Sequence, residues 1–516
     1  MWTRGWREAA WRRLEEPWDL LVIGGGITGA GILYEAARTG VKALLVEQRD
    51  FAWGTSSRSS KLVHGGLRYL RQGDLLLTRA SVRERERLIE ETPGLVEPLG
   101  FLAATRGDRL GGLLLGLGLS VYDVLAGRRT HRRHDAEEFR MLAPHLAGAG
   151  IDGGYSFRDA RTDDARLVLR LLRDATSRGA AAVNYAAARR LLRAGGRVAG
   201  AVLCDTESGR TAEVKARVVI NAAGAWSDRL REQVGGARRL RPLRGSHLVF
   251  PAWRLPAPQA LMLVHPADRR PLTVLPWEGA TLVGTTDLDH ERPLDEEPRI
   301  SPEEADYLMA ALRAHFPSLD LSLEDAVASF AGVRPVVGTG RADPSREARD
   351  HVVWEEQGLL TVTGGKLTTF RLIARDALEA AGRRLPPARP AGPRAPAFAM
   401  AACSPVAPLR LLGRHGDEAA AVLACAGPEE LAAIPGTHTL WAELRWAARA
   451  EGVVHLEDLL LRRVRLGLLL PQGGLGLAPR IRAIAQPELG WDHARWEREE
   501  AAYRALWSSC YGPVPA

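Results

Sequence analysis

Cysteine is scarce in this sequence, and its few copies are not spaced as a metal site would require. The 516 residues include 4 cysteines without any CxxC pair, namely Cys204, Cys403, Cys425 and Cys510. Structural zinc sites and disulfide frameworks both depend on closely spaced or paired cysteines. We therefore expect neither of them, and we expect a reducing compartment.

Long uninterrupted apolar runs are also missing. The first twenty residues carry arginine and glutamate among their apolar positions, so we expect no secretory signal. Residues 110–127 are the best candidate for a spanning helix, but Asp123 and several glycines interrupt them, which argues against a membrane crossing. Residues 1–17 mix tryptophan with arginine, a composition that suits a helix at a membrane interface and equally a helix packed on the protein itself.

Lysine is rare although the chain is basic. The net charge is +8, yet the 70 basic residues include few lysines, namely Lys42, Lys61, Lys215 and Lys366. A retained lysine can mark a place where a compact ammonium fits and a guanidinium does not, with chance placement as the alternative. A positive charge favours anionic substrates, anionic lipid surfaces or nucleic acid. Because arginine and glutamate alternate in residues 79–91, as on a solvated helix face, we expect no nucleic-acid partner.

The start of the chain has the pattern of a βαβ unit. Residues 18–23 predict a buried strand, residues 24–40 a glycine turn that opens a helix, and residues 42–47 a second buried strand. Parallel strands joined by a helix imply a doubly wound sheet, and the fold class is α/β. The pattern predicts a capped helix at 301–316 and further strands at 197–205, 216–224, 246–250, 272–277, 280–287 and 359–365.

The amino-acid composition of the sequence changes after residue 382. Residues 383–410 are rich in proline and alanine and predict a linker, whereas residues 439–470 show helical apolar spacing. At 516 residues we expect two or three domains. The predicted organisation is an N-terminal extension at 1–17, interleaved cofactor and substrate domains at 18–382, the linker at 383–410 and a helical domain at 411–516.

A glycine fingerprint follows the first predicted strand. Gly24, Gly26 and Gly29 form GxGxxG between a strand and a helix, where the helix N-terminus presents free amides to a pyrophosphate. Glu47 ends the next strand, placed to accept from a ribose hydroxyl and to repel the 2′-phosphate of NADP. Three distant stretches rich in glycine or hydroxyl side chains, at 54–70, 221–228 and 363–371, favour the long cofactor FAD over a nicotinamide cofactor.

Several runs together resemble one enzyme family. "DLLVIGGGITGAG", "TSSRSSKLVHGGLRYL", "DDARLVL", "GSHLVFP", "GTTD", "GVRPVV" and "GGKLTTFR", in this order, resemble the FAD-dependent glycerol-3-phosphate dehydrogenases. The likeness spans residues 18–377 and resumes more weakly around "EDLLLRRVR" at 457–465. It implies a Rossmann-type FAD-binding domain interleaved with an α+β substrate domain, plus a C-terminal helical domain. It further implies oxidation of sn-glycerol 3-phosphate to dihydroxyacetone phosphate, with electrons passed from FAD to a membrane quinone.

The resemblance also carries site residues over by position. The substrate pocket would be lined by Arg68, Tyr69, His247, Arg334, Arg349 and Lys366. FAD would be bound by Gly24, Gly25, Gly26, Ile27, Thr28, Gly29, Glu47, Gln48, Thr55, Ser56, Ser57, Ser59, Ser60, Lys61, Leu62, Ala188, Ala223, Gly224, Gly364, Gly365, Lys366, Leu367 and Thr368. The protein would be cytoplasmic and peripheral on the inner face of the cell membrane, in contact with its anionic surface.

The chemistry of these residue types agrees with the resemblance. A phosphate dianion calls for a guanidinium such as that of Arg334. Hydride transfer from C2 to the flavin requires a base for the C2 hydroxyl proton, for which we choose His247, with His64 as its rival. Lys366 and Arg334 would favour the developing alkoxide. We assign no metal site to the acids at 287–290, because alternating acids after a strand are more often a capped turn.

Three other functions compete with this interpretation. A glycerol-3-phosphate oxidase, which passes electrons to oxygen and forms hydrogen peroxide, would have the same pocket. A flavin module that binds nucleic acid would need clustered basic runs with aromatics, and an amino-acid oxidase would need a carboxylate clamp. The sequence is silent on oligomeric state, and a homodimer stays open.

Overall fold

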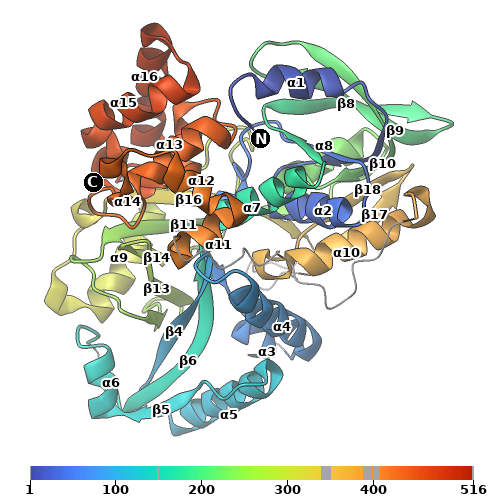
Figure 1. The fold of residues 1–516 in the computed structure, drawn as a ribbon. Helices are drawn as coiled ribbons and strands as arrows, with labels where there is room; N and C mark the ends of the chain where they lie inside the picture. The colour runs from blue at the N-terminus through green and yellow to red at the C-terminus, as the bar shows by residue number, and fades with distance from the viewer. Residues whose placement is uncertain are drawn as a thin grey trace.

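The computed structural model describes residues 2–71, 73–147, 150–338, 350–387, 398 and 407–513, without the side chains of Arg68, Arg71 and Arg109. In this part of the chain the strands form two large sheets, and helices gather in the C-terminal region (Figure 1). This mixed architecture confirms the predicted fold class.

The first sheet grows from the predicted βαβ unit. It has 8 strands, with β1 (Trp18–Ile23) parallel to both β2 (Ala43–Val46) and β10 (Thr211–Asn221). Its order is β17 (Val352–Glu356), β18 (Leu359–Thr363), β10, β1, β2 and β7 (Ala181–Val183). Strand β9 (Arg197–Asp205) pairs antiparallel with β10, and β8 (Ala186–Ala194) pairs antiparallel with β9. The predicted strands at 18–23, 42–47, 197–205, 216–224 and 359–365 are confirmed within a few residues at their ends.

Both faces of this sheet are covered, as the apolar runs of its strands require. Leu20 and Val22 of β1 face a core shared with the helices α2 (Ile27–Arg38), α7 (Asp164–Ser177) and α10 (Phe370–Ala381). Leu21 and Ile23 face a second core shared with β8, β9 and the N-terminal segment. The alternation along β1 therefore buries every side chain from Leu20 to Ile23.

The N-terminal residues pack on the protein itself. Helix α1 (Trp6–Arg13) lies beside β8 in Figure 1, and Trp2 and Trp11 are each only 6% exposed. The Trp2 indole donates to the carbonyl of Ala182 at 3.2 Å, and Arg7 forms an ion pair with Asp205 at 2.7 Å. Of the two interpretations open for residues 1–17, the structure supports packing on the protein, because Trp2 and Trp11 are buried against the first sheet.

The second sheet has 10 strands and is mostly antiparallel. Its order is β15 (Leu288–Asp289), β11 (Leu240–Pro251), β14 (Ala280–Gly284), β13 (Pro271–Trp277), β12 (Ala260–Val264), β4 (Val96–Thr105), β6 (Gly153–Thr162) and β3 (Leu62–Val63), with β16 (Ala328–Val337) on β11 and β5 (Arg132–Asp135) on β6. One face packs on α9 (Pro302–His315), which starts at the predicted Ser301 cap in a capping box with Glu304. At the lower end of Figure 1 lie α3 (Leu67–Arg71), α4 (Leu75–Glu91), α5 (Arg109–Ala126) and α6 (Ala136–Leu142).

The C-terminal region is helical and covers the other face of the second sheet. Trp441, Leu444 and Trp496 share a core with Phe101, Trp277 and Phe330 of that sheet. The helices are α11 (Leu409–His415), α12 (Ala419–Ala424), α13 (Trp441–Ala450), α14 (Leu466–Leu469), α15 (Ala478–Leu489) and α16 (His493–Cys510). The helical pattern predicted over 439–470 is interrupted after α13, where the backbone turns through Gly452 at φ +66°.

Buried ion pairs join the C-terminal region to the first sheet. Asp50, which follows β2, accepts from Arg462 at 2.5 Å and from Arg463 at 2.6 Å, and all three side chains are at most 1% exposed. Arg414 of α11 pairs with Asp163 at 2.9 Å in the same way. A buried charge whose partner is removed is strongly unfavourable, so these pairs fix how the two parts meet.

We expect Asp50→Asn to destabilise the fold, because it leaves the buried guanidinium of Arg463 without its carboxylate and removes one of the carboxylates that bind Arg462. The loss should be about 3–5 kcal/mol in the free energy of unfolding, measured by urea unfolding followed by tryptophan fluorescence. Asp289→Asn is the matched control, since the Arg241–Asp289 pair at 2.6 Å lies at the surface and should contribute about 1 kcal/mol or less. Equal losses in the two variants would contradict the account of the buried pairs.

Candidate functional site

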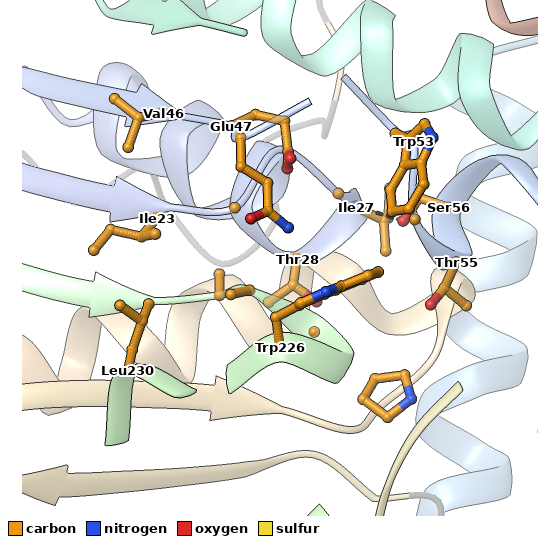
Figure 2. Close-up of a pocket in the computed structure, with 18 of the residues that line it drawn as sticks. Ile23, Ile27, Thr28, Val46, Glu47, Trp53, Thr55, Ser56, Trp226 and Leu230 are labelled. Atoms are coloured by element: carbon orange, nitrogen blue, oxygen red, sulfur yellow. Dashed lines mark hydrogen bonds between the residues drawn. The ribbon is translucent and has the colours of Figure 1, made fainter. Parts of the chain in front are cut away.

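A cavity of about 390 Å³ opens at the carboxyl ends of β1, β2, β10 and β18. This edge of a doubly wound sheet is where such folds bind their ligands. In Figure 2, Ile23, Val46 and Leu230 lie at one end of the cavity, and Trp53, Thr55 and Ser56 lie at the other. Its length suits an extended ligand.

The glycine turn after β1 forms one wall. Gly24 has φ +117°, and a Cβ at this position would collide with the carbonyl oxygen of Ala222. The carboxylate of Glu47 accepts from the amide of Gly25 at 2.6 Å and from the amide of Arg49 at 3.0 Å. Burial raises the pKa of Glu47, while these amide donors oppose the shift. The turn is thus closed around a carboxylate that also lines the cavity.

The hydroxyl-rich loop that follows β2 forms a second wall. Ser56 Oγ accepts from the amide of Ile27 at 2.9 Å, at the start of α2. Ser59 donates to the carboxylate of Asp164 at 2.7 Å, and Thr55 donates to the carbonyl of Val333 on the second sheet. The small hydroxyl side chains of residues 55–60 therefore hold a loop between the two sheets close to the cavity.

Lys61, which the resemblance implies as a flavin contact, forms its hydrogen bonds inside the protein. Its side chain is fully buried, and Nζ donates to both oxygens of Asp164 at 2.9 and 2.8 Å and to the carbonyl of Ser57 at 2.6 Å. Burial lowers its pKa to about 7, although Asp164 opposes the shift. Among the described residues Lys61 is a buried anchor of the loop and does not line the cavity.

The structure brings most of the predicted cofactor residues to one cavity. Those that line it are Gly24, Gly26, Ile27, Thr28, Glu47, Gln48, Thr55, Ser56, Ser59, Ala188, Ala223, Gly224, Gly364, Gly365, Lys366 and Leu367. Those predicted that lie behind or beside it are Gly25, Gly29, Ser57, Ser60, Lys61, Leu62 and Thr368. The cavity also includes Gly54, Ala222 and Trp226, from the stretches predicted at 54–70 and 221–228. Residues that the sequence did not single out are Ile23, Val46, Trp53, Ala186, Arg189, Arg229, Leu230, Gln233 and Pro335.

Two tryptophans that line the cavity pack against each other (Figure 2). The ring centroids of Trp53 and Trp226 are 5.5 Å apart, and the guanidiniums of Arg49 and Arg58 lie over Trp53 at 4.2 and 4.8 Å. Trp53 directly precedes the predicted stretch at 54–70, and Trp226 lies within the one at 221–228. The positions of these stretches in the sequence therefore indicated both tryptophans as neighbours of the ligand.

A second group of predicted residues lies on one face of the second sheet. Gly245 of β11 is directly opposite Gly332 of β16, with His247 opposite Phe330 on one side and Arg334 on the other. Residues two apart on a strand share a face, so the imidazole and the guanidinium lie on the same side of the sheet, separated along the strands by the glycine pair. A Cβ at Gly245 would collide with the guanidinium of Arg334.

Neighbouring side chains hold Arg334 in position. Its guanidinium donates to Asp287 at 2.9 Å and to Thr285 Oγ1 at 3.0 Å. Asp287, which is buried, also pairs with Arg270 at 3.4 Å. Arg334 is thus a pre-oriented cation of the kind that recognises phosphate.

Two further predicted substrate residues meet at the cavity edge. The ammonium of Lys366 lies 3.4 Å from the ring centroid of Tyr69, and the ring of His64 is 6.2 Å from that of Tyr69. Pro335, next to Arg334, lines the same cavity as Lys366, so both sheets contribute to one site. Arg349 and the side chain of Arg68 lie outside the described residues.

The cavity fits FAD on its own features. Glycines let the backbone approach a ligand, the first turn of α2 points its amides at the cavity, and Glu47 stands where a ribose hydroxyl would donate. The residues that would hold FAD come from the turn after β1, the loop at 54–59, the turn at 222–226 and the turn at 364–367.

Comparisons with known proteins agree with this site. A family model described as FAD dependent oxidoreductase matches residues 19–376, and one described as C-terminal domain of alpha-glycerophosphate oxidase matches residues 400–496. Glycerol-3-phosphate dehydrogenase 2 of Mycobacterium tuberculosis is 35% identical over 529 residues, which cover 97% of this chain and 90% of that protein. Aerobic glycerol-3-phosphate dehydrogenase of Bacillus subtilis is 38% identical over 378 residues, covering 72% of this chain and 68% of its own. The X-ray structure of the glycerol-3-phosphate dehydrogenase from Bacillus halodurans complexed with FAD has a TM-score of 0.77 and 27% identity, with 100% of both chains covered.

We expect Gly24→Ala to abolish retention of flavin, because the new methyl group would meet the carbonyl of Ala222 in the cavity wall. The ratio of flavin to protein absorbance after purification should fall by at least about tenfold, a loss of 1.4 kcal/mol or more. Gly118→Ala is the matched control, since open space surrounds that position in α5. Full flavin content in Gly24→Ala would contradict the placement of the cofactor.

Proposed function

Because the chain belongs to the family of FAD-dependent glycerol-3-phosphate dehydrogenases, with FAD as its cofactor, we propose that it oxidises sn-glycerol 3-phosphate to dihydroxyacetone phosphate. One observation carries the proposal: a buried imidazole and a pre-oriented guanidinium share one face of the second sheet, where Pro335, next to Arg334, lines the cofactor cavity. FAD, when bound, accepts the hydride that leaves C2 of the substrate.

The phosphate end of the substrate would bind the cations of the site. Arg334 is held by Asp287 and Thr285, and Lys366 brings a second positive charge from the other sheet. A planar guanidinium can bind phosphate through two parallel hydrogen bonds, which a lone ammonium cannot do. The family resemblance adds Tyr69, Arg68 and Arg349 to this proposed pocket.

The proton of the C2 hydroxyl would go to His247. This imidazole is 2% exposed, and burial lowers its pKa well below the usual value, with Lys61 and Arg334 adding to the shift. A histidine whose pKa is lowered stays neutral at pH 7 and keeps a lone pair that can accept a proton. His64 stays the rival base, because its ring lies beside Tyr69 near the cavity.

Anaerobic addition of sn-glycerol 3-phosphate should bleach the flavin absorbance of the purified protein. We expect Arg334→Ala to raise the substrate concentration for half-maximal bleaching rate by about 10- to 100-fold, the contribution of hydrogen bonds to a charged group. Arg313→Ala, on the exposed side of α9, is the control and should behave as the wild type. If the wild-type flavin stays yellow at saturating substrate, the proposed reaction is wrong.

We further propose that the electrons pass to a quinone at an anionic membrane surface, and that α5 makes the membrane contact. Five apolar side chains of this helix are exposed, namely Leu110, Leu113, Leu114, Leu117 and Val124, at 57–79%. The leucines recur at helical spacing and form a stripe that points away from the protein. Within the described chain no helix is long and apolar enough to cross a bilayer, so an interfacial contact is the form that suits this stripe.

Charge around α5 supports the same partner. Arg128, Arg129, Arg132 and Arg133 follow the helix and are exposed. Arg128 pairs with Glu90 and Arg132 with Glu138, so Arg129 and Arg133 contribute most of the positive charge. A cationic rim beside an apolar stripe favours the anionic leaflet of a cell membrane, in keeping with a location on its inner face. We place the membrane contact here and not at the N-terminal segment, because Trp2 and Trp11 of that segment are buried.

We expect Leu113→Ser/Leu114→Ser/Leu117→Ser to reduce flotation with anionic vesicles by about tenfold or more, because the variant loses the apolar area that would enter the interface. Reduction of a quinone analogue carried in those vesicles should fall in parallel, whereas reduction of a water-soluble dye should not change. The control is Leu288→Ser/Leu409→Ser/Leu431→Ser, which alters exposed leucines scattered over other elements.

The assay with quinone-carrying vesicles also identifies the electron acceptor, when peroxide is measured alongside. Quinone reduction without peroxide supports the dehydrogenase. Peroxide that accounts for every electron would make the protein a glycerol-3-phosphate oxidase, and unchanged flotation of the α5 variant would move the membrane contact elsewhere.

A further inference from the structure

The ring of His247 is fixed on both faces. It stacks on Phe330 with 4.6 Å between centroids and an interplanar angle of 11°, and a Cβ at Gly284 would collide with its other side. The Nε2 atom lies 2.9 Å from Ser60 Oγ. The Nδ1 atom is buried and has no hydrogen-bond partner among the described residues.

From this geometry we propose that Ser60 is a positioning residue whose Oγ accepts the Nε2–H of His247, so that Nδ1 is the atom that takes the substrate proton. The inference rests on the proposed function, since it names the atom that performs the proton transfer of that reaction. It adds a role for Ser60 to the cofactor contact that the family resemblance implies.

The tautomer of His247 can be inferred by asking which hydrogen-bonding group each tautomer would leave without a partner in the interior. If Ser60 donated to Nε2, the single proton of the neutral ring would sit on Nδ1 as a buried N–H with no acceptor. Unpaired buried N–H groups are rarer in folded proteins than unpaired acceptors. The reverse arrangement leaves a lone pair on Nδ1, which the C2 hydroxyl of the substrate can satisfy.

The transfer then balances with these atoms. The O–H bond of the C2 hydroxyl breaks and an Nδ1–H bond forms, while the hydride and its two electrons leave C2 for FAD and the C2–O bond becomes a carbonyl. The resulting imidazolium keeps its Nε2–H bonded to Ser60. A serine hydroxyl supports this cation more weakly than a carboxylate would, so the base can release its proton after the reaction.

The charged groups around the ring act in the same direction. Lys61 from the loop and Arg334 from β16 both disfavour the imidazolium, and each is itself paired, with Asp164 and Asp287 respectively. Ser60 is therefore the neutral acceptor in a cationic surrounding.

Its neighbours in sequence fix the position of Ser60. Ser59 donates both its amide and its hydroxyl to Asp164, at 3.0 and 2.7 Å, and Lys61 donates to both oxygens of the same carboxylate. A residue held between two anchors on one buried group has little freedom to move. Such supporting contacts keep a catalytic side chain in its productive geometry.

The first test is the tautomer of His247, read from two-bond ¹H–¹⁵N correlations of the ¹⁵N-histidine-labelled protein at pH 7, with and without FAD. His247→Asn identifies the signal. We expect the Nε2–H form in the wild type and in Ser60→Thr, and a mixture of tautomers in Ser60→Ala. An Nδ1–H form in the wild type would overturn the inference.

The second test is the pH dependence of flavin reduction by the substrate. With Ser60→Ala we expect roughly five- to tenfold slower reduction at pH 7, the effect of one neutral hydrogen bond. The imidazolium loses an acceptor, so the pKa of His247 falls and the acid limb of the profile moves to lower pH, whereas KM changes little.

Matched variants separate this role from a structural one. Ser60→Thr should restore the rate and the profile. Ser246→Ala should keep the wild-type profile, because its hydroxyl points to Glu304 on the other face of β11. A Ser60→Ala profile equal to the wild type at equal flavin content would refute the inference. A wild-type flavin that the substrate does not bleach would instead refute the proposed function.

Discussion

The carboxylate of Asp164 is the contact on which the site depends. It lies at the start of α7 and binds Lys61, Ser59 and Arg465, which come from segments far apart in the sequence. Lys61 and Arg465 also donate to the carbonyl of Ser57, so the loop beside the cavity is held from two directions. A buried charge that loses its partner is strongly unfavourable. The loop at 55–60, the start of α7 and the C-terminal region therefore depend on one another through Asp164.

This constraint explains why the C-terminal helices matter to a site that they do not line. Arg462 and Arg463 bind Asp50 behind the cofactor cavity, and Arg465 binds Asp164 behind the loop at 55–60. The helical region thus supports the cavity wall from the side opposite the ligand. The run "EDLLLRRVR" at 457–465 supplies these arginines. Their role in supporting the site is a physical reason why this run resembles the family although the sequence around it resembles the family less.

The two sheets contribute different parts of the site. The parallel sheet provides the cavity for FAD, and the antiparallel sheet provides a face that carries His247 and Arg334. The loop at 55–60 joins the two, because Ser56 bonds to α2, Thr55 to Val333 and Ser60 to His247. The apolar stripe of α5 lies at another end of the molecule, so a membrane contact there leaves the cavity mouth unchanged (Figure 1).

Local sequence determined the βαβ start, the capped helix at 302–315 and the glycine turn that admits a dinucleotide, because strand periodicity, capping and glycine sterics act between near neighbours. Only the tertiary structure decided that Trp2 and Trp11 are buried, that Lys61 anchors the loop behind the cavity, that Trp53 and Trp226 flank it and that the leucines of α5 face outward. An apolar stripe or a lysine looks the same in a sequence whether it is covered or exposed. The partner that covers a side chain, or pairs its charge, comes from a distant segment that only the folded chain brings near.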